Sequence, residues 1–358
     1  MNILVDYIKT HPNWRTELAE KPYCISIKDD GPYTLFSYSQ IDSDMSLPLV
    51  QICRGIILKN ADTSPKVVCY PFSKFFNYSE PNAHPIDWAS AKIQSKIDGS
   101  IIKVFFDEGW HVSTNGMIDA FKAELQFATN EFKSFGDLFM IGWKNSTPFD
   151  FDHLLSKDYT SIFELVSPFN RVVVPYKEIT LYTIGCRNNL TEQEHPFTLP
   201  SFNAPKLYSF ATFEDMIEST KTLPYSEEGY VVVDKNFNRI KVKGIEYVAC
   251  HRLKGEAFSD KRAIELALIG EGSEFLSYFP EYKPIVDRAS AAINSIKSYL
   301  LEKQEELSSR SFETQKDFAL FIKDWKYTGF FFGYRSGKIK SVEEYLQGMD
   351  SKEIAKYM

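Results

Sequence analysis

The pentapeptide Lys96-Ile97-Asp98-Gly99-Ser100 brings together an amine, a carboxylate and a glycine turn. Apolar segments lie on both sides, so we expect the lysine at a strand-to-turn junction, partly shielded from water. Shielding and nearby positive charge both lower the pKa of an amine, and only a neutral amine can attack phosphorus. Asp98 lies on the same face of an extended segment and can hold the lysine or a metal-bound water. Taken alone, however, this pentapeptide is more typical of a surface hairpin turn.

Two other segments place a cation beside residues that favour a β-strand. Arg54 and Gly55 open the apolar residues 56–58, and Lys74 precedes the aromatic residues 75–76. Taken singly, each segment has a simpler explanation. Arg54 would begin a surface strand, and Lys74 would extend its amine to solvent from a strand in the core.

A buried carboxylate is also predicted. Glu164 interrupts the apolar residues 161–166, and a carboxylate among apolar neighbours needs a hydroxyl, a cation or a metal as its partner. The alternative is an edge strand from which Glu164 faces solvent.

Residues 227–243 indicate a β-hairpin, with Glu228 before its first strand and Lys241 and Lys243 in its second. Because side chains on a strand repeat every two residues, both lysines project from one face. That spacing suits two contacts to a phosphate group. The alternative is a solvated basic face.

The composition is that of an ordinary globular protein of 358 residues, 44% hydrophobic and 25% charged, enough for two or three domains. No apolar run reaches the length of a membrane span, and no secretory signal is visible. The five scattered cysteines indicate reduced thiols in a cytoplasmic protein, without disulfides or a zinc site. A net charge of −7 excludes a strongly basic nucleic-acid binder but not a local basic groove.

The pattern of elements divides the chain into two parts. Short β-type runs dominate residues 1–248, interrupted by helices predicted at 118–133 and 212–220, the latter with Thr212 as N-cap. Residues 249–358 are predicted to be mainly helical. There the periodic apolar positions predict helices at 261–269, 285–300, 314–325 and 342–347.

Arg-Gly, Lys-x-Asp-Gly, a glutamate strand, Glu-Gly and Lys-x-Lys follow one another along the chain. This order resembles the covalent nucleotidyltransferase superfamily of ATP-dependent nucleic-acid ligases and RNA capping enzymes. More narrowly, residues 30–250 are similar to the phage RNA ligase 1 family. The strings that carry the narrower resemblance are Leu35-Phe36-Ser37-Tyr38, Cys53-Arg54-Gly55-Ile56, Lys74-Phe75-Phe76-Asn77, Phe163-Glu164 followed by Asn170-Arg171-Val172-Val173, Glu228-Gly229-Tyr230-Val231 and Ile240-Lys241-Val242-Lys243.

The resemblance implies an α+β fold, with a nucleotidyltransferase (ATP-grasp-like ligase) core of antiparallel sheets and helices and a mainly α-helical C-terminal domain. Residues 1–248 would form the adenylyltransferase domain, and residues 249–358 would select the RNA substrate. Cations and aromatics between residues 323 and 340 suit contacts to phosphates and stacking on unpaired bases. The alternative is that these aromatics are core residues and the lysines are merely solvated.

The resemblance also implies roles for the cations. Lys96 would be the nucleophile that takes AMP from ATP through a phosphoamide bond. Arg54 and Lys74 would hold the leaving pyrophosphate, and Lys241 and Lys243 would grip the α-phosphate.

Carboxylates and apolar residues take the remaining implied roles. Glu164 and Glu228 would contact the ribose or hold the waters of a Mg²⁺ or Mn²⁺ ion, with Asp98 assisting. Tyr38 and Val231 would border the adenine.

One part of the family pattern is missing. The pattern has a lysine-bearing strand between the nucleophile and the glutamate strand, but the corresponding residues 110–116 contain no lysine. That contact would therefore be absent or supplied by Ser113, Thr114 or Asn115.

The implied reaction has three steps. ATP adenylates Lys96, AMP passes to an RNA 5′-phosphate, and an RNA 3′-hydroxyl attacks that activated end, which seals the phosphodiester and releases AMP. A broken tRNA or another single-stranded loop is a candidate substrate, and a polynucleotide kinase-phosphatase is a candidate functional partner. We expect no membrane association and a cytoplasmic protein, in the host cytoplasm if a phage encodes it.

Three other functions stay open. A DNA ligase and a capping guanylyltransferase share the chemistry, although each should carry an oligonucleotide-binding barrel, and none is recognisable after Lys243. A catalytically silent nucleic-acid-binding protein would keep the fold, but binding alone does not require a neutral amine.

Overall fold

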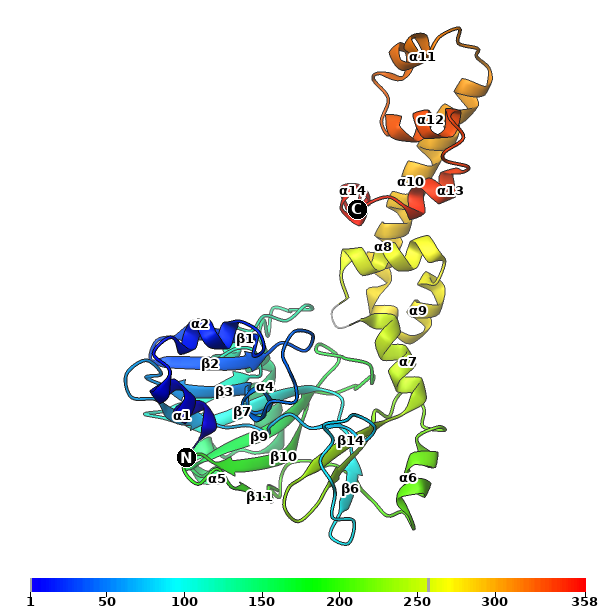
Figure 1. Ribbon diagram of the computed structural model, residues 1–358. Coiled ribbons are helices and arrows are strands. Elements are labelled where there is room, and N and C mark those ends of the chain that lie inside the picture. Colours follow the sequence, from blue (N-terminus) through cyan, green and yellow to red (C-terminus); the bar gives the residue numbers. More distant parts are fainter. Residues whose placement is uncertain (1, 256–257) are drawn as a thin grey trace. The chain divides into compact units, whose positions relative to one another are not determined.

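The computed structural model describes residues 2–255 and 258–358 (Figure 1). The chain forms two compact units, Met1–Ala249 and Cys250–Met358. Within the described residues, the first unit contains three β-sheets and short helices, and the second unit is helical. The α+β fold predicted from the sequence is confirmed. The functional roles predicted for the two parts stay predictions.

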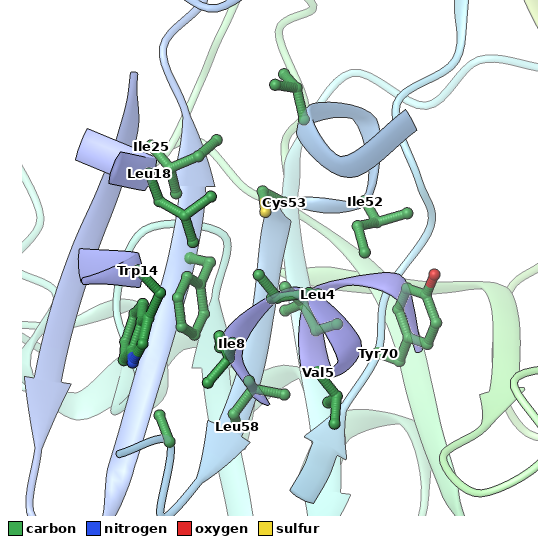
Figure 2. Close-up of a cluster of buried hydrophobic side chains, with 14 residues drawn as sticks. Leu4, Val5, Ile8, Trp14, Leu18, Ile25, Ile52, Cys53, Leu58 and Tyr70 are labelled. Atoms are coloured by element: carbon green, nitrogen blue, oxygen red, sulfur yellow. The ribbon is translucent and has the colours of Figure 1, made fainter. Parts of the chain in front are cut away.

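Four antiparallel strands form the first sheet, in the order β1-β2-β3-β4. The strands and the helices beside them are α1 (Ile3–Thr10), α2 (Trp14–Ala19), β1 (Ile25–Asp30), β2 (Tyr33–Tyr38), α3 (Pro48–Ile52), β3 (Arg54–Lys59) and β4 (Lys66–Cys69). Helices α1 and α2 cover one face, where Leu4 and Trp14 belong to one buried cluster with Leu58 (Figure 2). The other face carries Ile57, which packs in a second cluster with Phe105.

Five strands form the second sheet, in the order β11-β10-β9-β7-β8. Its strands and helices are β7 (Ser100–Phe106), β8 (Trp110–Thr114), α4 (Phe135–Ser146), α5 (Phe151–Leu154), β9 (Tyr159–Val166), β10 (Thr180–Asn188) and β11 (Glu194–His195). One face carries Ile102 and Phe163, which pack with Phe139 of α4. Lys103 and Glu164 point to the opposite face, because side chains alternate along a strand. Since β9 is an interior strand, the edge-strand alternative for Glu164 is wrong.

The third sheet has the order β12-β6-β13-β14-β5. Its strands and helices are β5 (Phe76–Asn77), β6 (Lys92–Ser95), β12 (Leu207–Tyr208), α6 (Phe213–Ser219), β13 (Gly229–Val233), β14 (Arg239–Lys243) and α7 (Ile245–Lys254). Strands β13 and β14 form the predicted hairpin, while β5 pairs with β14 in parallel. Helix α6 begins at the predicted N-cap, where the Thr212 side chain accepts a hydrogen bond from the Asp215 N–H.

The helix predicted at residues 118–133 is wrong. Only a 3-10 turn, Ala120–Lys122, forms there. Helix α4 begins afterwards, at a capping box in which Ser134 and Asp137 exchange hydrogen bonds. The apolar spacing indicated a helix, but the cap signal lies after the periodic stretch, and cap chemistry decides where a helix starts.

The second unit is built on the long helix α10 (Lys283–Ser308). Its buried stripe, which includes Ala289 and Ile296, lies in the helix predicted at residues 285–300, although the helix begins earlier and ends later than predicted. The other helices are α8 (Asp260–Ile269), α9 (Gly272–Tyr278), α11 (Gln315–Ile322), α12 (Thr328–Arg335), α13 (Val342–Gln347) and α14 (Ser351–Ala355), with a 3-10 turn at Pro280–Tyr282. Among the described residues, no helix has both the length and the apolar character needed to cross a bilayer.

Candidate active site

Lys96 directly follows β6, at the start of a short loop that two neighbouring strands hold in place. The backbone N–H of Lys96 donates to the Gly229 carbonyl at 2.8 Å. The Gly99 N–H donates to Oε1 of Glu164 at 3.2 Å. Beyond the loop, the Lys96 Nζ donates to Oε2 of Glu228 at 2.8 Å. The loop therefore spans the second and third sheets and presents the amine between two carboxylates.

Glu228 joins two of the predicted lysines. Its Oε2 accepts from Lys96, and its Oε1 lies 2.9 Å from the Nζ of Lys243. The Glu228 side chain is only 2% exposed. Burial raises the pKa of Glu228, but the two lysines outweigh this effect and hold its pKa below the ordinary value. Glu228 is thus an ionised buried carboxylate with both oxygens occupied.

The charge state of Lys96 differs from the prediction. Burial lowers the pKa of the amine, but the carboxylates of Glu228 and Glu164 outweigh burial, so the pKa of Lys96 is raised. The expectation of a lowered pKa considered shielding and neighbouring cations and left out the two carboxylates. Without bound nucleotide, Lys96 is an ammonium ion.

The carboxyl group of Glu164 is less strongly held in its ionised form than that of Glu228. It is 8% exposed, on the interior strand β9. Burial raises the pKa of Glu164 to about 7, although Lys96 and Arg54 favour its ionised form. A carboxyl group of this kind gains or loses charge in response to what binds beside it.

Lys74, Lys241 and Lys243 form a lysine cluster beside β14. Lys74 comes shortly before β5, which pairs with β14 in parallel, and its charge acts on Lys241. Burial lowers the pKa of Lys241 to about 8, and Lys74, Lys243 and Lys96 contribute to this lowering. Among the described residues, the amine of Lys241 has no salt bridge. Such a concentration of positive charge favours a phosphate group.

A β-bulge determines the orientation of the Arg54 side chain. Strands β2 and β3 pair Phe36 with Ile56 and Ser37 with Arg54, so Gly55 is an extra residue in the ladder. Phe36 and Ile56 face α1 and α2. The bulge therefore turns Arg54 to the opposite face, where it lines a cavity. The buried Nη1 of Arg54 has no hydrogen-bond partner within the described residues.

The cavity has a volume of about 820 Å³, within the range of small-molecule sites. Four predicted residues line it: Arg54, Lys96, Glu164 and Val231. The remaining predicted residues are not among its lining side chains, namely Tyr38, Lys74, Asp98, Glu228, Lys241 and Lys243. The ring of Tyr38 lies 5.2 Å from the amine of Lys74, so Tyr38 supports a cation here instead of bordering the cavity.

Asp98 serves as an anchor in this structure. Its Oδ2 accepts hydrogen bonds from the N–H groups of Val173 and Val174, each at 2.8 Å. Its Oδ1 accepts from the hydroxyl of Tyr247 at 2.7 Å. These contacts fix the loop that carries Lys96, and they leave the carboxylate less available to a metal than the prediction supposed.

Arg239, which was not predicted from the sequence as a site residue, also lines the cavity. Its guanidinium donates to Glu194 at 2.5 Å, and Glu194 also pairs with Arg187, so the ion cluster ties β14 to β10 and β11. The signal was present, because Arg239 stands two residues before Lys241 on the same face of the strand. Of the three residues considered as substitutes for the missing lysine, Thr114 and Asn115 line the cavity.

The carboxylates suit a hard cation in chemical type. Mg²⁺ and Mn²⁺ prefer oxygen ligands, which Glu164 and Glu228 supply. Among the described residues, no three His, Cys, Asp or Glu side chains are arranged to hold a metal. In this arrangement Glu228 binds two lysines instead.

The chain belongs to the RNA ligase family, whose model matches residues 52–247. It is 26% identical to the RNA ligase of Rhodothermus phage RM378, over 84% of this chain and 83% of that protein. It is 26% identical to RNA ligase 1 of bacteriophage TS2126, over 61% of this chain and 56% of that protein.

A further relative is longer than this chain. A protein of Autographa californica nuclear polyhedrosis virus, provisionally named a bifunctional polynucleotide kinase/RNA ligase, is 32% identical over 70% of this chain. The match spans only 38% of the viral protein. Among solved structures, an archaeal ATP-dependent RNA ligase is 14% identical over 92% of this chain and 91% of that one, with a TM-score of 0.44.

Proposed function

We propose that this chain is an ATP-dependent RNA ligase that joins an RNA 5′-phosphate to an RNA 3′-hydroxyl through AMP bound covalently to Lys96. The observation that best supports this proposal is the position of the Lys96 amine. It lies at the wall of the 820 Å³ cavity, in contact with one buried carboxylate and close to a second. Membership of the RNA ligase family favours RNA over DNA as the substrate.

In the first step, the Lys96 nitrogen attacks the α-phosphorus of ATP. The N–P bond forms, the bond from that phosphorus to the β-phosphate oxygen breaks, and pyrophosphate leaves with the electron pair. The ammonium must first lose a proton to solvent, because the Glu228 carboxylate that accepts its hydrogen bond at 2.8 Å has a lowered pKa and is a weak base. The polyphosphate of ATP brings further negative charge into the site, and the lysine cluster would balance that charge.

The cations have separate tasks in this proposal. Negative charge develops on the phosphoryl oxygens and on pyrophosphate, and donors placed in advance stabilise it. Lys241 and Lys243, side by side on one face of β14, would hold the α-phosphate. Arg54 and Lys74 would hold the pyrophosphate.

Carboxylates and apolar groups complete the nucleotide site. Glu164 and Glu228 would hold a Mg²⁺ or Mn²⁺ ion, which supplies charge neutralisation to the phosphate oxygens when bound. Asp98 would act through the loop that it anchors. Val231 would border the adenine, and Tyr38 would act through Lys74.

The later steps use RNA. The 5′-phosphate of one end takes AMP from Lys96, and the 3′-hydroxyl of the other end displaces AMP from that phosphate. The helical unit Cys250–Met358 would help to select the RNA, and a separate kinase and phosphatase activity would supply suitable ends. The viral relative, whose name combines a kinase with a ligase, supports such a pairing.

The test is the intact mass of the full chain after incubation with ATP and Mg²⁺. We expect a gain of one AMP in the wild-type protein and none in Lys96→Ala. Incubation with GTP in place of ATP distinguishes a capping enzyme, and nicked DNA in place of RNA distinguishes a DNA ligase. Absence of any adduct from the wild-type protein would favour the silent binding protein instead.

A further inference from the structure

Lys103 is a buried amine to which the proposed reaction assigns no task. It lies on β7 between two fully buried residues and is itself fully buried. It shares a face of the second sheet with Phe105, which packs against the first sheet. Within the described residues no carboxylate pairs with it. A buried charge without a partner is costly, so an apolar side chain would suit this position better if packing were its only role.

The Lys103 amine makes one specific contact, and that contact is to the bulge in β3. Its Nζ donates to the carbonyl oxygen of Gly55 at 2.5 Å. Gly55 has a φ of +86°, in the region that favours glycine. A Cβ atom at Gly55 would lie 2.8 Å from the Lys103 Nζ and 2.8 Å from the Asn115 carbonyl oxygen. The bulge and the amine therefore fit closely together.

The direction of Arg54 depends on this bulge. In a regular strand Arg54 would share the face of Ile56, which packs under α1 and α2. With Gly55 inserted, Arg54 stands opposite Ser37, whose hydroxyl donates to Asn115 on the side of the second sheet. A group that holds the Gly55 carbonyl in place therefore also fixes the orientation of the Arg54 side chain.

Few other groups interact with the Lys103 amine. The groups that influence it most, after burial itself, are the Cys69 thiol and the Arg54 guanidinium. Ser113, which stands opposite Lys103 on β8, has a buried hydroxyl without a hydrogen-bond partner in the described part of the chain. The Gly55 carbonyl is therefore the principal acceptor for this amine.

We propose that Lys103 is a positioning residue for the polyphosphate of the nucleotide. By holding the Gly55 carbonyl it fixes the bulge that turns Arg54 into the cavity, where Arg54 meets the β- and γ-phosphates. This inference rests on the proposed function only for the choice of ligand. It predicts a specific pattern: loss of Lys103 weakens binding of ATP but not of AMP, which lacks those two phosphates.

The experiment measures the dissociation constants of ATP and AMP by calorimetry. All proteins are full-length and carry Lys96→Ala, so that no covalent adduct forms. Lys103→Met removes the donor and keeps the volume of the side chain. We expect it to weaken ATP binding by roughly 10- to 100-fold, because small displacements of a positioned group have effects of this size. AMP binding should stay within about twofold of its starting value.

Two comparisons separate positioning from general damage. Lys59→Met is the matched control, because Lys59 lies on the same strand β3 but pairs with Asp107 and Glu108 outside the cavity. It should change neither constant. In a protein that already carries Arg54→Ala, Lys103→Met should have little further effect on ATP binding, because it acts through Arg54.

The inference is overturned if Lys103→Met leaves ATP binding unchanged, weakens ATP and AMP equally, or adds its full effect to that of Arg54→Ala. If the methionine variant does not fold, Lys103→Gln, which keeps a neutral donor, carries the same comparison with a smaller expected loss. The proposed function fails separately, if the wild-type protein forms no AMP adduct. Selective loss of ATP binding would then still establish Lys103 as a positioning residue of a nucleotide site.

Discussion

Lys96 and Lys103 begin and end one short stretch of chain, and the protein treats the partly exposed amine of Lys96 and the fully buried amine of Lys103 in opposite ways. Lys96 lies between carboxylates, which raise its pKa although burial opposes them. Lys103 has no carboxylate partner among the described residues, and burial lowers its pKa to about 8. Burial by itself lowers the pKa of both amines. The difference shows that acidic neighbours raise the pKa of Lys96 against the effect of burial, whereas burial dominates at Lys103.

The largest expected effect is on formation of the AMP adduct, which should require Lys96 but not Lys103. Lys96→Ala should abolish the AMP adduct, because no other amine in the described part of the chain both touches Glu228 and lines the cavity. The same variant should still seal RNA supplied with an adenylated 5′ end, since that substrate bypasses the first step. Intact mass and a gel-based sealing assay measure the two activities.

Lys103→Met is the matched variant for this comparison. It should still form the adduct, at an ATP concentration high enough to offset weaker binding. An adduct in Lys96→Ala, or its complete absence from Lys103→Met at saturating ATP, would reverse the roles given to these two lysines.

The next largest effect concerns the lysine cluster beside Lys96. Lys241→Ala and Lys243→Ala should each slow adenylation by roughly two to three orders of magnitude, because each removes a positioned cation from the developing charge. Single-turnover rates at saturating ATP measure this effect, and circular dichroism checks the fold. Lys92→Ala, an exposed lysine at the start of β6, is the control. Near-normal rates in both variants would contradict the placement of the α-phosphate.

Lys241 should also make adenylation sensitive to pH. Its pKa is lowered to about 8 by burial and by the neighbouring lysines. Its positive charge is therefore present below pH 8 and is lost as the pH rises through that value. Adenylation at subsaturating ATP should fall between about pH 7.5 and 9 in the wild-type protein, with the pH values chosen around that pKa. The decline should be shallower in Lys241→Arg, which keeps its charge throughout.

Local patterns predicted the strands that carry several of the candidate residues. The hairpin that carries Lys241 and Lys243 follows from alternation and a turn, and both are properties of consecutive residues. The glutamate strand of Glu164 follows from an apolar run interrupted once. These features repeat along the chain itself, so the sequence shows them directly.

The features that sequence did not predict depend on register between distant segments. The bulge at Gly55 exists only relative to β2, and the contact from Lys103 depends on how the first and second sheets face each other. The raised pKa of Lys96 depends on Glu228, which is far away in sequence. A pattern within one segment cannot reveal the partner that another segment brings.

Replacing Lys103 and replacing Lys96 should change the free energy of unfolding in opposite directions. Below pH 8 the burial cost of the Lys103 charge is present in full, because the amine is protonated in both the folded and the unfolded protein. Between pH 8 and 10.5 the unfolded chain binds more protons, so stability rises with pH and the cost disappears. Each pKa unit corresponds to about 1.4 kcal/mol.

Lys103→Met should therefore raise the free energy of unfolding near pH 7 by roughly 2 kcal/mol, after loss of the Gly55 hydrogen bond, and should lose this advantage near pH 10. Lys96→Met should lower the free energy of unfolding near pH 7 by roughly 1–3 kcal/mol, because Glu228 loses a partner while buried. Urea unfolding at the two pH values measures both. Changes of the same sign in the two variants would refute the distinction.

The smallest effect concerns the helical unit, where we expect substitutions to weaken RNA binding and leave adenylation of Lys96 unchanged. Phe330 is buried there, so it is a core residue and not a platform for bases, while Lys338 and Lys340 are exposed. Replacing both lysines with glutamate in the full chain should leave adduct formation unchanged, because these residues belong to the other compact unit. Ligation of a stem-loop RNA should weaken by a few fold, and the salt dependence of RNA binding should decrease by roughly 0.7 in log–log slope for each phosphate that the protein no longer neutralises. Lys261→Glu, an exposed charge reversal on α8, is the control. An unchanged salt dependence together with an unchanged ratio of stem-loop to single-strand ligation would remove Lys338 and Lys340 from RNA recognition.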